Sequence, residues 1–333
     1  MGRPRQDVST PAEEFRNAYA RKRILVTGGA GFLGSWLAEA LIAAGAKVHL
    51  LDNFSTGRRA NIAKLRRVVK VIRGDVAGAK LRPVYDYIFH MSSRAAPEEY
   101  QLHPIETLMA NSTGTMQMLD LARKSDAVMV YASTSEVYGD AAVVPTPETY
   151  YGYVSSTGIR SCYDEGKRFG EAACMAYHRQ HGVKVRLPRI FNSYGPRIRS
   201  DGFYGRVVPR FILQALRHEP LTINGDGTQT RSFCYVTDTV RGLMMVGAAS
   251  GVDGQAFNIG NAEEISITTL ARKVLQASGS KSDLEFMPAR EDDPRRRCPD
   301  LKKTLELGWR PTTSLDDGLS KTVAFFREAA HVR

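Results

Sequence analysis

The sequence predicts an α/β protein with a doubly wound, mostly parallel sheet and a smaller carboxy-terminal lobe. Three observations predict this fold. In the first half of the chain, short apolar runs of strand length alternate with longer helical patterns. A glycine-rich turn joins the first apolar run to the first helical pattern. After about residue 190, prolines and glycines break the alternation, which indicates a separate lobe over the carboxyl edge of the sheet.

The first strand–helix–strand unit is the most regular part of the sequence. Residues 24–27 form an apolar run that stops at glycines, as expected of a strand buried on both faces. Residues 32–44 place apolar side chains on one helical face, and residues 48–51 form a second strand. Such a unit is typical of parallel strands joined by a right-handed crossover.

The elements that follow continue the same alternation. We expect further strands at residues 68–72, 87–91 and 127–132. Long helical patterns cover residues 104–124 and 161–180, and a shorter one covers residues 207–217 in the second half.

Composition limits the classes of function. The chain has 333 residues, of which 43% are hydrophobic, so a sizeable core can form. Lys and Arg number 46 against 35 Asp and Glu, a net charge of +11. This excess suits nucleic acid, an anionic membrane or a phosphorylated small molecule. We expect no nucleic-acid partner, because the basic residues do not alternate with aromatic ones.

We also expect no membrane partner and no metal site. No apolar run reaches the length that spans a bilayer. The cysteines form no CxxC pair and have no histidine at metal-ligand spacing. Buried thiols in a reducing compartment are the expected state of all four, so the chain is predicted to be soluble and cytoplasmic. They are Cys162, Cys174, Cys234 and Cys298.

The glycine-rich turn predicts a dinucleotide site. Glycines there let the backbone approach a pyrophosphate, and the helix that follows directs its amide hydrogens at the phosphates. Asp52 ends the second strand, where a carboxylate accepts hydrogen bonds from ribose hydroxyls and repels a 2′-phosphate. This favours NAD, with Arg58 and Arg59 leaving NADP as the alternative. The expected cofactor contacts are Gly28, Gly31, Phe32, Leu33, Gly34, Asp52, Asn53, Asp75 and Val76.

A tyrosine and a lysine four residues apart are the first candidates for catalysis. Tyr163 and Lys167 lie on one face of the predicted helix. An ammonium group near a phenol favours the phenolate, so we expect Lys167 to lower the pKa of Tyr163. Thr134 and Glu136 directly follow the strand at residues 127–132, where a hydroxyl can position a sugar and a carboxylate can act as acid, base or orienting group.

Six segments together resemble a known family. TGGAGFLG, ASTSEVYGD, SCYDEGKR, RIFNSYGPR, GDGTQTRSFCYVTD and DDPRRRCPD occur in the order seen in extended short-chain dehydrogenase/reductases that act on nucleotide sugars. The set is most similar to the UDP-glucuronate decarboxylases (UDP-xylose synthases), over about residues 22–320.

The resemblance implies a role for each candidate residue. Tyr163 would be the base, and Lys167 its partner, which also holds the nicotinamide ribose. Thr134 and Glu136 would contact the reacting sugar. The expected substrate-binding residues are Ser135, Asn192, Arg206, Val207, Arg231 and one of Arg295 and Arg296, with Arg297 in the same run. Arg94 lies where this chain departs from the family, and we expect it to face either the cofactor phosphates or the substrate.

The resemblance also implies a domain division and a quaternary structure. Residues 22–191 plus about 233–261 would form the NAD-binding Rossmann domain. Residues 192–232 plus 262–333 would form the nucleotide-sugar-binding lobe, and residues 1–21 a polar extension. A homodimer is expected through the helices at residues 104–124 and 161–180.

The expected reaction is NAD-dependent decarboxylation of UDP-glucuronate to UDP-xylose through a 4-keto intermediate. A 4-epimerase needs only room for the ketone to rotate and stays open as an alternative. A 4,6-dehydratase is disfavoured, because Ser135 stands where such enzymes carry an acid. A TDP-linked substrate also stays open. A non-catalytic NAD-binding scaffold is disfavoured because Tyr163, Lys167 and Thr134 are all present.

Overall fold

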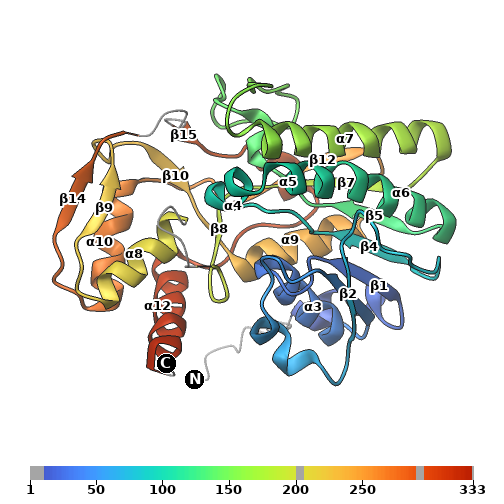
Figure 1. The fold of residues 1–333 in the computed structure, drawn as a ribbon, viewed down its shortest axis with the longest axis horizontal. Coiled ribbons are helices and arrows are strands. Elements are labelled where there is room, and N and C mark those ends of the chain that lie inside the picture. The colour runs from blue at the N-terminus through green and yellow to red at the C-terminus, as the bar shows by residue number, and fades with distance from the viewer. Residues whose placement is uncertain (1–10, 200–205, 290–295, 332–333) are drawn as a thin grey trace, which may run out of the picture.

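The computed structural model describes residues 11–199, 206–289 and 296–331. Its main sheet has the strand order β12-β7-β5-β4-β1-β2-β3, and each neighbouring pair is parallel (Figure 1). The order reverses between β1 and β4, as in a doubly wound sheet. The predicted fold class is therefore confirmed. The strands are β1 (Arg23–Thr27), β2 (Lys47–Asp52), β3 (Lys70–Arg73), β4 (Tyr87–His90), β5 (Val128–Tyr131), β7 (Val185–Ile190) and β12 (Gln255–Ile259).

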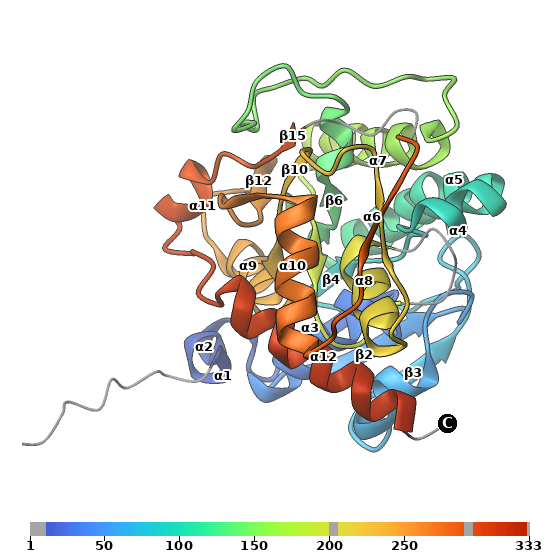
Figure 2. The ribbon, with the colours of Figure 1, turned by 90° about the vertical axis from the view of Figure 1, so that its left-hand side faces the viewer.

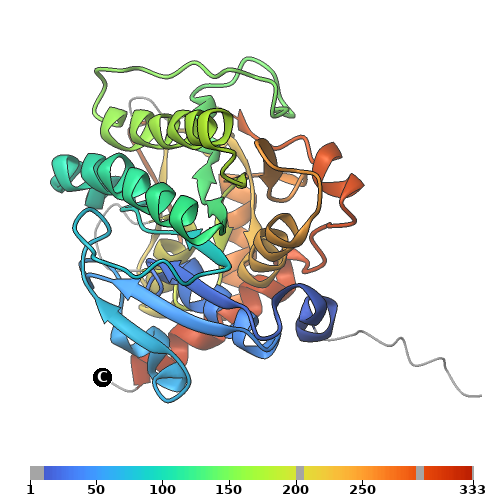
Figure 3. The ribbon, with the colours of Figure 1, turned by 90° about the vertical axis from the view of Figure 1, so that its right-hand side faces the viewer.

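Helices cover both faces of this sheet, which explains why its central strands are apolar on both sides. The helices α6 (Thr113–Ser125) and α7 (Ser161–His181) contact β4 and β5 on one face. The helices α3 (Phe32–Ala43) and α9 (Val236–Ala248) contact β2 and β5 on the other (Figures 1 and 3).

The helix predicted at residues 104–124 is in fact two helices. The first, α5 (Pro104–Asn111), ends at Ser112, and α6 begins at Thr113. The sequence Asn111-Ser112-Thr113-Gly114 lowers helix propensity at this point, because Ser and Asn side chains compete for backbone hydrogen bonds. The Ser112 hydroxyl donates to the Leu108 carbonyl at 2.6 Å. Apolar periodicity continues across the break, which is why the sequence predicts one helix.

The amino-terminal segment only partly matches the predicted polar extension. Residues 1–10 lie outside the described residues. Two short helices follow, α1 (Pro11–Glu14) and α2 (Arg16–Tyr19). Phe15 and Tyr19 are buried in the core, and the Tyr19 hydroxyl donates to the Met244 carbonyl at 2.7 Å. These two aromatic side chains attach the segment to α9, which the polar residues around them conceal in the sequence.

The second half of the chain builds the smaller lobe (Figures 1 and 2). Strand β10 (Thr230–Ser232) lies between β13 (Glu264–Ser266) and β15 (Arg296–Arg297). Figure 2 shows α10 (Ile267–Ser278) in front of the main sheet, packed with α8 (Val207–Leu216) and α12 (Leu315–His331). The exact domain boundaries stay a prediction. Further elements are η1 (Arg59–Leu65), α4 (Pro97–Leu102), β6 (Ser133–Thr134), η2 (Ser135–Tyr138), β8 (Ser193–Tyr194), β9 (Leu221–Asn224), β11 (Cys234–Tyr235), β14 (Leu284–Met287) and α11 (Lys302–Glu306).

Within the described ranges, no helix combines the length and the apolar character that crossing a bilayer requires.

Candidate active site

A cavity of about 250 Å³ lies at the carboxyl ends of β1, β2 and β4. The glycine-rich turn after β1 forms one wall. Gly28 has a φ of +65°, and a Cβ on Gly34 would clash with the Gly28 carbonyl oxygen. Both positions therefore require glycine, and the open backbone between them is the cradle that a dinucleotide pyrophosphate needs. All of the expected cofactor residues outside the catalytic pair line this cavity: Gly28, Gly31, Phe32, Leu33, Gly34, Asp52, Asn53, Asp75 and Val76.

Asp52 is fixed at the end of β2 by the turn itself. Its carboxylate accepts hydrogen bonds from the Ala30 amide at 2.8 Å and the Phe54 amide at 2.7 Å. Burial raises the pKa of Asp52, and these two amides oppose the rise. Arg58 and Arg59 do not line the cavity, and the Arg59 guanidinium lies over the Phe54 ring. The Asp52 carboxylate at the cavity wall fits the ribose hydroxyls of NAD better than the 2′-phosphate of NADP.

A larger cavity of about 590 Å³ adjoins the first and lies between the main sheet and the smaller lobe. Leu33, Met91 and Arg206 line both cavities, so the two cavities are neighbours. Most of the expected catalytic and substrate residues are brought together here: Thr134, Ser135, Glu136, Tyr163, Lys167, Asn192, Arg206, Val207 and Arg231. Arg94 lines the smaller cavity instead, where it bonds Glu99 at 2.9 Å.

Helix α7 holds Tyr163 and Lys167 on the face that borders the larger cavity. The ring of Tyr163 stacks on the ring of Tyr100, with centroids 5.2 Å apart and planes at 8°. The Lys167 ammonium donates to the Ala132 carbonyl at 2.8 Å and lies 6.0 Å from the centre of the Tyr163 ring. Tyr100 was not predicted from the sequence, because it comes from α4 and nothing near it in the chain carries a motif.

The pKa values of this pair differ from the expectation. Burial raises the pKa of Tyr163 to about 12, although a hydrogen bond with Thr134 lowers it. Burial lowers the pKa of Lys167 to about 7, so a large fraction of its amino groups is uncharged near neutral pH. The expectation of a lowered Tyr163 pKa is therefore wrong for the protein alone, because burial raises that pKa. A ligand that places a positive charge beside the Tyr163 phenol lowers the pKa of Tyr163 from this raised value.

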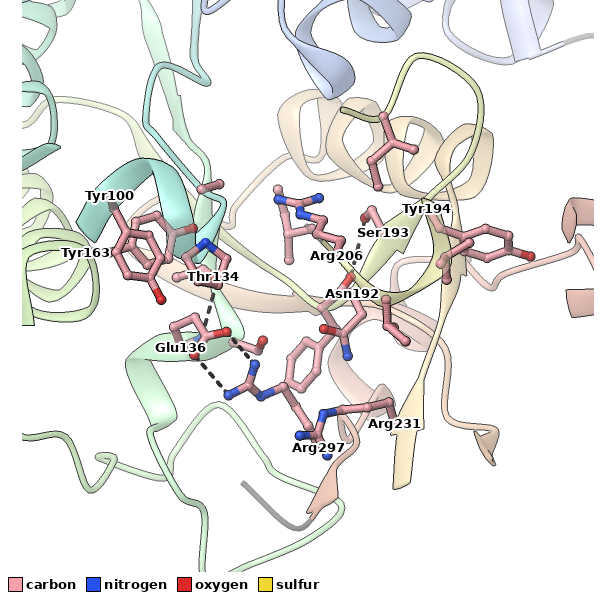
Figure 4. A pocket seen from close by; sticks show the side chains of 18 of the residues that line it. Tyr100, Thr134, Glu136, Tyr163, Asn192, Ser193, Tyr194, Arg206, Arg231 and Arg297 are labelled. Carbon is pink, nitrogen blue, oxygen red and sulfur yellow. Dashed lines mark hydrogen bonds and ion pairs between the residues drawn. The ribbon is translucent and has the colours of Figure 1, made fainter. Parts of the chain in front are cut away.

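Glu136 is held between two arginines from different parts of the chain. The Arg297 guanidinium bonds both carboxylate oxygens of Glu136, with Oε2 at 2.9 Å, and Arg160 bonds Oε2 as well. Figure 4 shows Glu136 between Thr134 and Arg297 on the cavity wall. Burial alone would raise the pKa of Glu136, but Arg297 and Arg160 hold it below its ordinary value. Glu136 is thus an ionised group here, suited to accepting hydrogen bonds.

The arginine run at 295–297 contributes one described residue to the cavity. Arg295 lies outside the described residues. Arg296 is exposed, bonds Glu264 at 3.2 Å and does not line the cavity. Arg297 lines the cavity, because β15 pairs in parallel with β10 so that Arg297 lies opposite Arg231. Figure 4 shows these two side chains next to each other.

The remaining predicted contacts form the wall on the lobe side. The Asn192 amide donates to the Ser232 carbonyl at 3.1 Å, and Arg231 donates to the Thr230 carbonyl at 2.8 Å. Burial lowers the pKa of Arg206, which nevertheless stays a cation beside Tyr163 and Glu136. Arg160 completes the set of cations around the cavity. Its signal in the sequence is its spacing, because it lies three residues before Tyr163 and so shares a helical face with it.

Comparison with known proteins agrees with this geometry. The model of the NAD dependent epimerase/dehydratase family matches residues 24–260. UDP-glucuronic acid decarboxylase 1 of Xenopus tropicalis is 46% identical over 324 residues, which are 96% of this chain and 75% of that protein. The chain belongs to the NAD dependent epimerase/dehydratase family. UDP-glucuronic acid decarboxylase 5 of Arabidopsis thaliana is 43% identical over 96% of this chain and 93% of its own.

Solved structures of the NAD dependent epimerase/dehydratase family have the same fold. The epimerase Mth375 of Methanothermobacter thermautotrophicus superposes with a TM-score of 0.90 at 30% identity, over 98% of both chains. The dTDP-glucose 4,6-dehydratase DesIV of Streptomyces venezuelae, solved with NAD bound, gives a TM-score of 0.83 at 29% identity, over 93% of this chain and 98% of its own. The cofactor of the family is NAD, as the sequence predicts.

Proposed function

We propose that this chain decarboxylates UDP-glucuronate to UDP-xylose. The observation that carries the proposal is identity of 43–47% to UDP-glucuronic acid decarboxylases over more than nine-tenths of the chain. The site supports it, because Tyr163, Lys167, Thr134 and Glu136 border one cavity that adjoins the dinucleotide cradle.

The residues of the cavity supply the acid–base part of this reaction. Thr134 orients the sugar 4-hydroxyl toward Tyr163, and the tyrosine oxygen takes the hydroxyl proton as the C4 carbon is oxidised. A bound NAD would supply the hydride acceptor for the oxidation at C4 and the hydride donor for the final reduction. Lys167 holds the ribose of the cofactor. The resulting 4-keto acid loses CO₂ because the ketone takes up the electron pair, and C5 is then protonated.

The charges around the cavity suit an acidic nucleotide sugar. Arg206, Arg231 and Arg297 line it together, and Glu136 is the carboxylate that faces them. These three arginines and Glu136 together carry a net positive charge. A diphosphate and a sugar carboxylate carry enough negative charge to neutralise it. Guanidinium groups bind both anions with paired hydrogen bonds.

The nucleobase end of the cavity leaves two substrates to compare. Arg210 and Asn224 line the lobe end, and the Gln229 amide donates to the Asn224 carbonyl at 2.8 Å. Arg210 donates to the Thr222 carbonyl at 3.0 Å. Uracil and thymine present the same carbonyl acceptors to such donors. The UDP-linked and TDP-linked acids are therefore tested side by side.

The decisive experiment is mass spectrometry of the products from UDP- and TDP-linked hexuronates and hexoses with NAD present. We expect the hexuronate to lose the mass of CO₂ without net NADH. Loss of the mass of water would indicate a dehydratase, and an unchanged mass with inverted stereochemistry an epimerase. Tyr163→Phe is the control and should bind NAD without forming product.

The quaternary structure we propose is a homodimer through α5 and α7, and we place the protein in the cytoplasm as the sequence predicts. These helices pack together along one edge of the molecule (Figure 1). Their outer faces expose large apolar side chains, among them Ile105, Leu108 and Phe169 at 71%, 41% and 46%. A patch of this kind is typical of a protein interface.

A further inference from the structure

The contacts of Glu136 are arranged so that one of its two arginines can be given up. Glu136 follows β5 and β6 of the main sheet, and Arg160 directly precedes α7, which packs on that sheet, so both residues belong to the sheet-and-helix part of the molecule and not to the smaller lobe. Arg297 comes from β15 in the smaller lobe. The side chains are 17%, 22% and 11% exposed, so all three charges are largely removed from water. Glu136 and its arginines therefore form a bridge across the cavity between the sheet and the lobe.

In this bridge, Glu136 occupies both terminal nitrogens of Arg297. The two nitrogens bond the two oxygens of Glu136, which is the geometry by which arginine binds any carboxylate. A substrate carboxylate that binds Arg297 in this way must first displace Glu136. The displacement replaces one carboxylate by another on the same guanidinium, so that Arg297 stays paired throughout.

The displaced Glu136 then needs a partner of its own. A buried carboxylate that loses its cation is strongly destabilising. Arg160 already bonds the oxygen of Glu136 that it shares with Arg297, and it remains in place when Arg297 leaves. Asp164 bonds Arg160 weakly, at 3.4 Å, so that it leaves most of the guanidinium to Glu136.

We propose that Arg160 is a positioning residue that retains Glu136 when the carboxylate of the substrate takes over Arg297. The inference rests on the proposed function, because it requires an acidic sugar. It assigns Arg160 no contact with the reacting atoms. Its effect is on selectivity: without Arg160, Glu136 depends on Arg297 alone and competes with the acidic substrate for it. A nucleotide sugar without a carboxylate on the sugar does not compete with Glu136 for Arg297.

The test compares the binding of UDP-glucuronate and UDP-glucose to the NAD-loaded protein by calorimetry. Tyr163→Phe serves as the parent, so that neither ligand is turned over. The parent should bind UDP-glucuronate more tightly than UDP-glucose. Arg160→Met should weaken UDP-glucuronate at least about tenfold and leave UDP-glucose nearly unchanged. Arg160→Lys should recover part of the loss.

A second substitution separates positioning from a structural role. Adding Glu136→Gln to Arg160→Met removes the competing carboxylate, so UDP-glucuronate affinity should return to within about threefold of the parent. The double variant takes the carboxylate partner from Arg297 and the cation partner from Asp164, so its fold and NAD binding are verified before the affinities are compared, and Arg160→Lys supplies a second variant that keeps a cation beside both carboxylates. The matched control is Arg168→Met, two turns further along α7. The Arg168 guanidinium holds the carbonyls of Val137 and Tyr151 at 3.0 and 2.7 Å, so both ligands should weaken equally.

The possible failures are distinguishable. A parent that binds the two ligands equally well overturns the proposed function and this inference with it. A parent that prefers UDP-glucuronate, combined with an Arg160→Met variant that keeps the same ratio of affinities, overturns the role of Arg160 alone. Failure of Glu136→Gln to restore the ratio in a folded, NAD-binding double variant also overturns it.

Discussion

Arg297 lies opposite Arg231 in the parallel pairing of β15 with β10, so two arginines far apart in the sequence face the same cavity. The neighbouring Arg296 points away and bonds Glu264. Successive side chains of a strand point to opposite faces, which explains the difference between the two.

This alternation predicts opposite outcomes for adjacent substitutions. Arg297→Met removes a cation that faces the cavity and should lower kcat/KM for the acidic substrate about a hundredfold or more. Arg296→Met removes an exposed ion pair and should leave kcat/KM within about twofold. Steady-state kinetics of the two variants check this. Equal losses in both would mean that the pairing of β15 with β10 is different in solution.

The glycine turn predicts a loss of cofactor binding. A Cβ on Gly34 would clash with the Gly28 carbonyl, so Gly34→Ala must open the turn that receives the pyrophosphate. We expect NAD affinity to fall by about tenfold or more. Gly78→Ala is the matched control, because a Cβ there meets no atom within 4 Å. Cofactor titration by fluorescence compares them, and unchanged affinity in Gly34→Ala would place the pyrophosphate elsewhere.

Asp164 predicts how stability depends on pH. Burial, and then the charge of Glu136, raise the pKa of Asp164 to about 7, against about 4 in the unfolded chain. The folded protein therefore binds more protons than the unfolded chain between these values, and this residue's contribution to stability is lost as the pH rises from about 4 to 7.

Asp164→Asn should remove the fall in stability that Asp164 causes as the pH rises from about 4 to 7. At pH 7 the variant should be more stable than the parent by on the order of 2 kcal/mol, and near pH 4 the two should agree. Denaturant titrations across this range measure the difference. Asp126→Asn is the control for the change of residue type, since its side chain is 89% exposed. A difference between Asp164→Asn and the parent that stays constant from about pH 4 to 7 would contradict the raised pKa of Asp164.

The exposed apolar faces of α5 and α7 predict a dimer that charge disrupts. Ile105→Glu combined with Phe169→Glu should convert the protein to a monomer in light scattering at micromolar concentration. Val68→Glu changes an equally apolar side chain, 61% exposed just before β3, and should leave the dimer intact. A parent protein that is already monomeric would refute the interface.

The cofactor side of the site was predictable because its determinants are local. The glycine turn follows β1, Asp52 ends β2 and Asp75 comes two residues after β3, and parallel strands bring their carboxyl ends to one edge. The same reasoning locates Thr134 after β5. Tyr163 and Lys167 needed only the helical period of α7.

The substrate side was less predictable because it depends on long-range pairing. Three identical residues at 295–297 give no signal of which one faces inward, and the answer lies in the register between β15 and a strand about 65 residues earlier. The ion pair between Arg160 and Glu136 joins η2 to the start of α7, across the long connection between these two elements. The pKa of Tyr163 depends on burial, which the YxxxK spacing does not reveal.

The most direct test of the account follows the carboxylate carbon itself. UDP-glucuronate labelled at C6 is incubated with the NAD-loaded protein, and the label is measured in released CO₂ and in the sugar nucleotide. We predict that all of the label in converted substrate appears as CO₂, with an equal amount of UDP-xylose and no accumulation of NADH. Label that stays in a converted sugar nucleotide would contradict the proposed reaction.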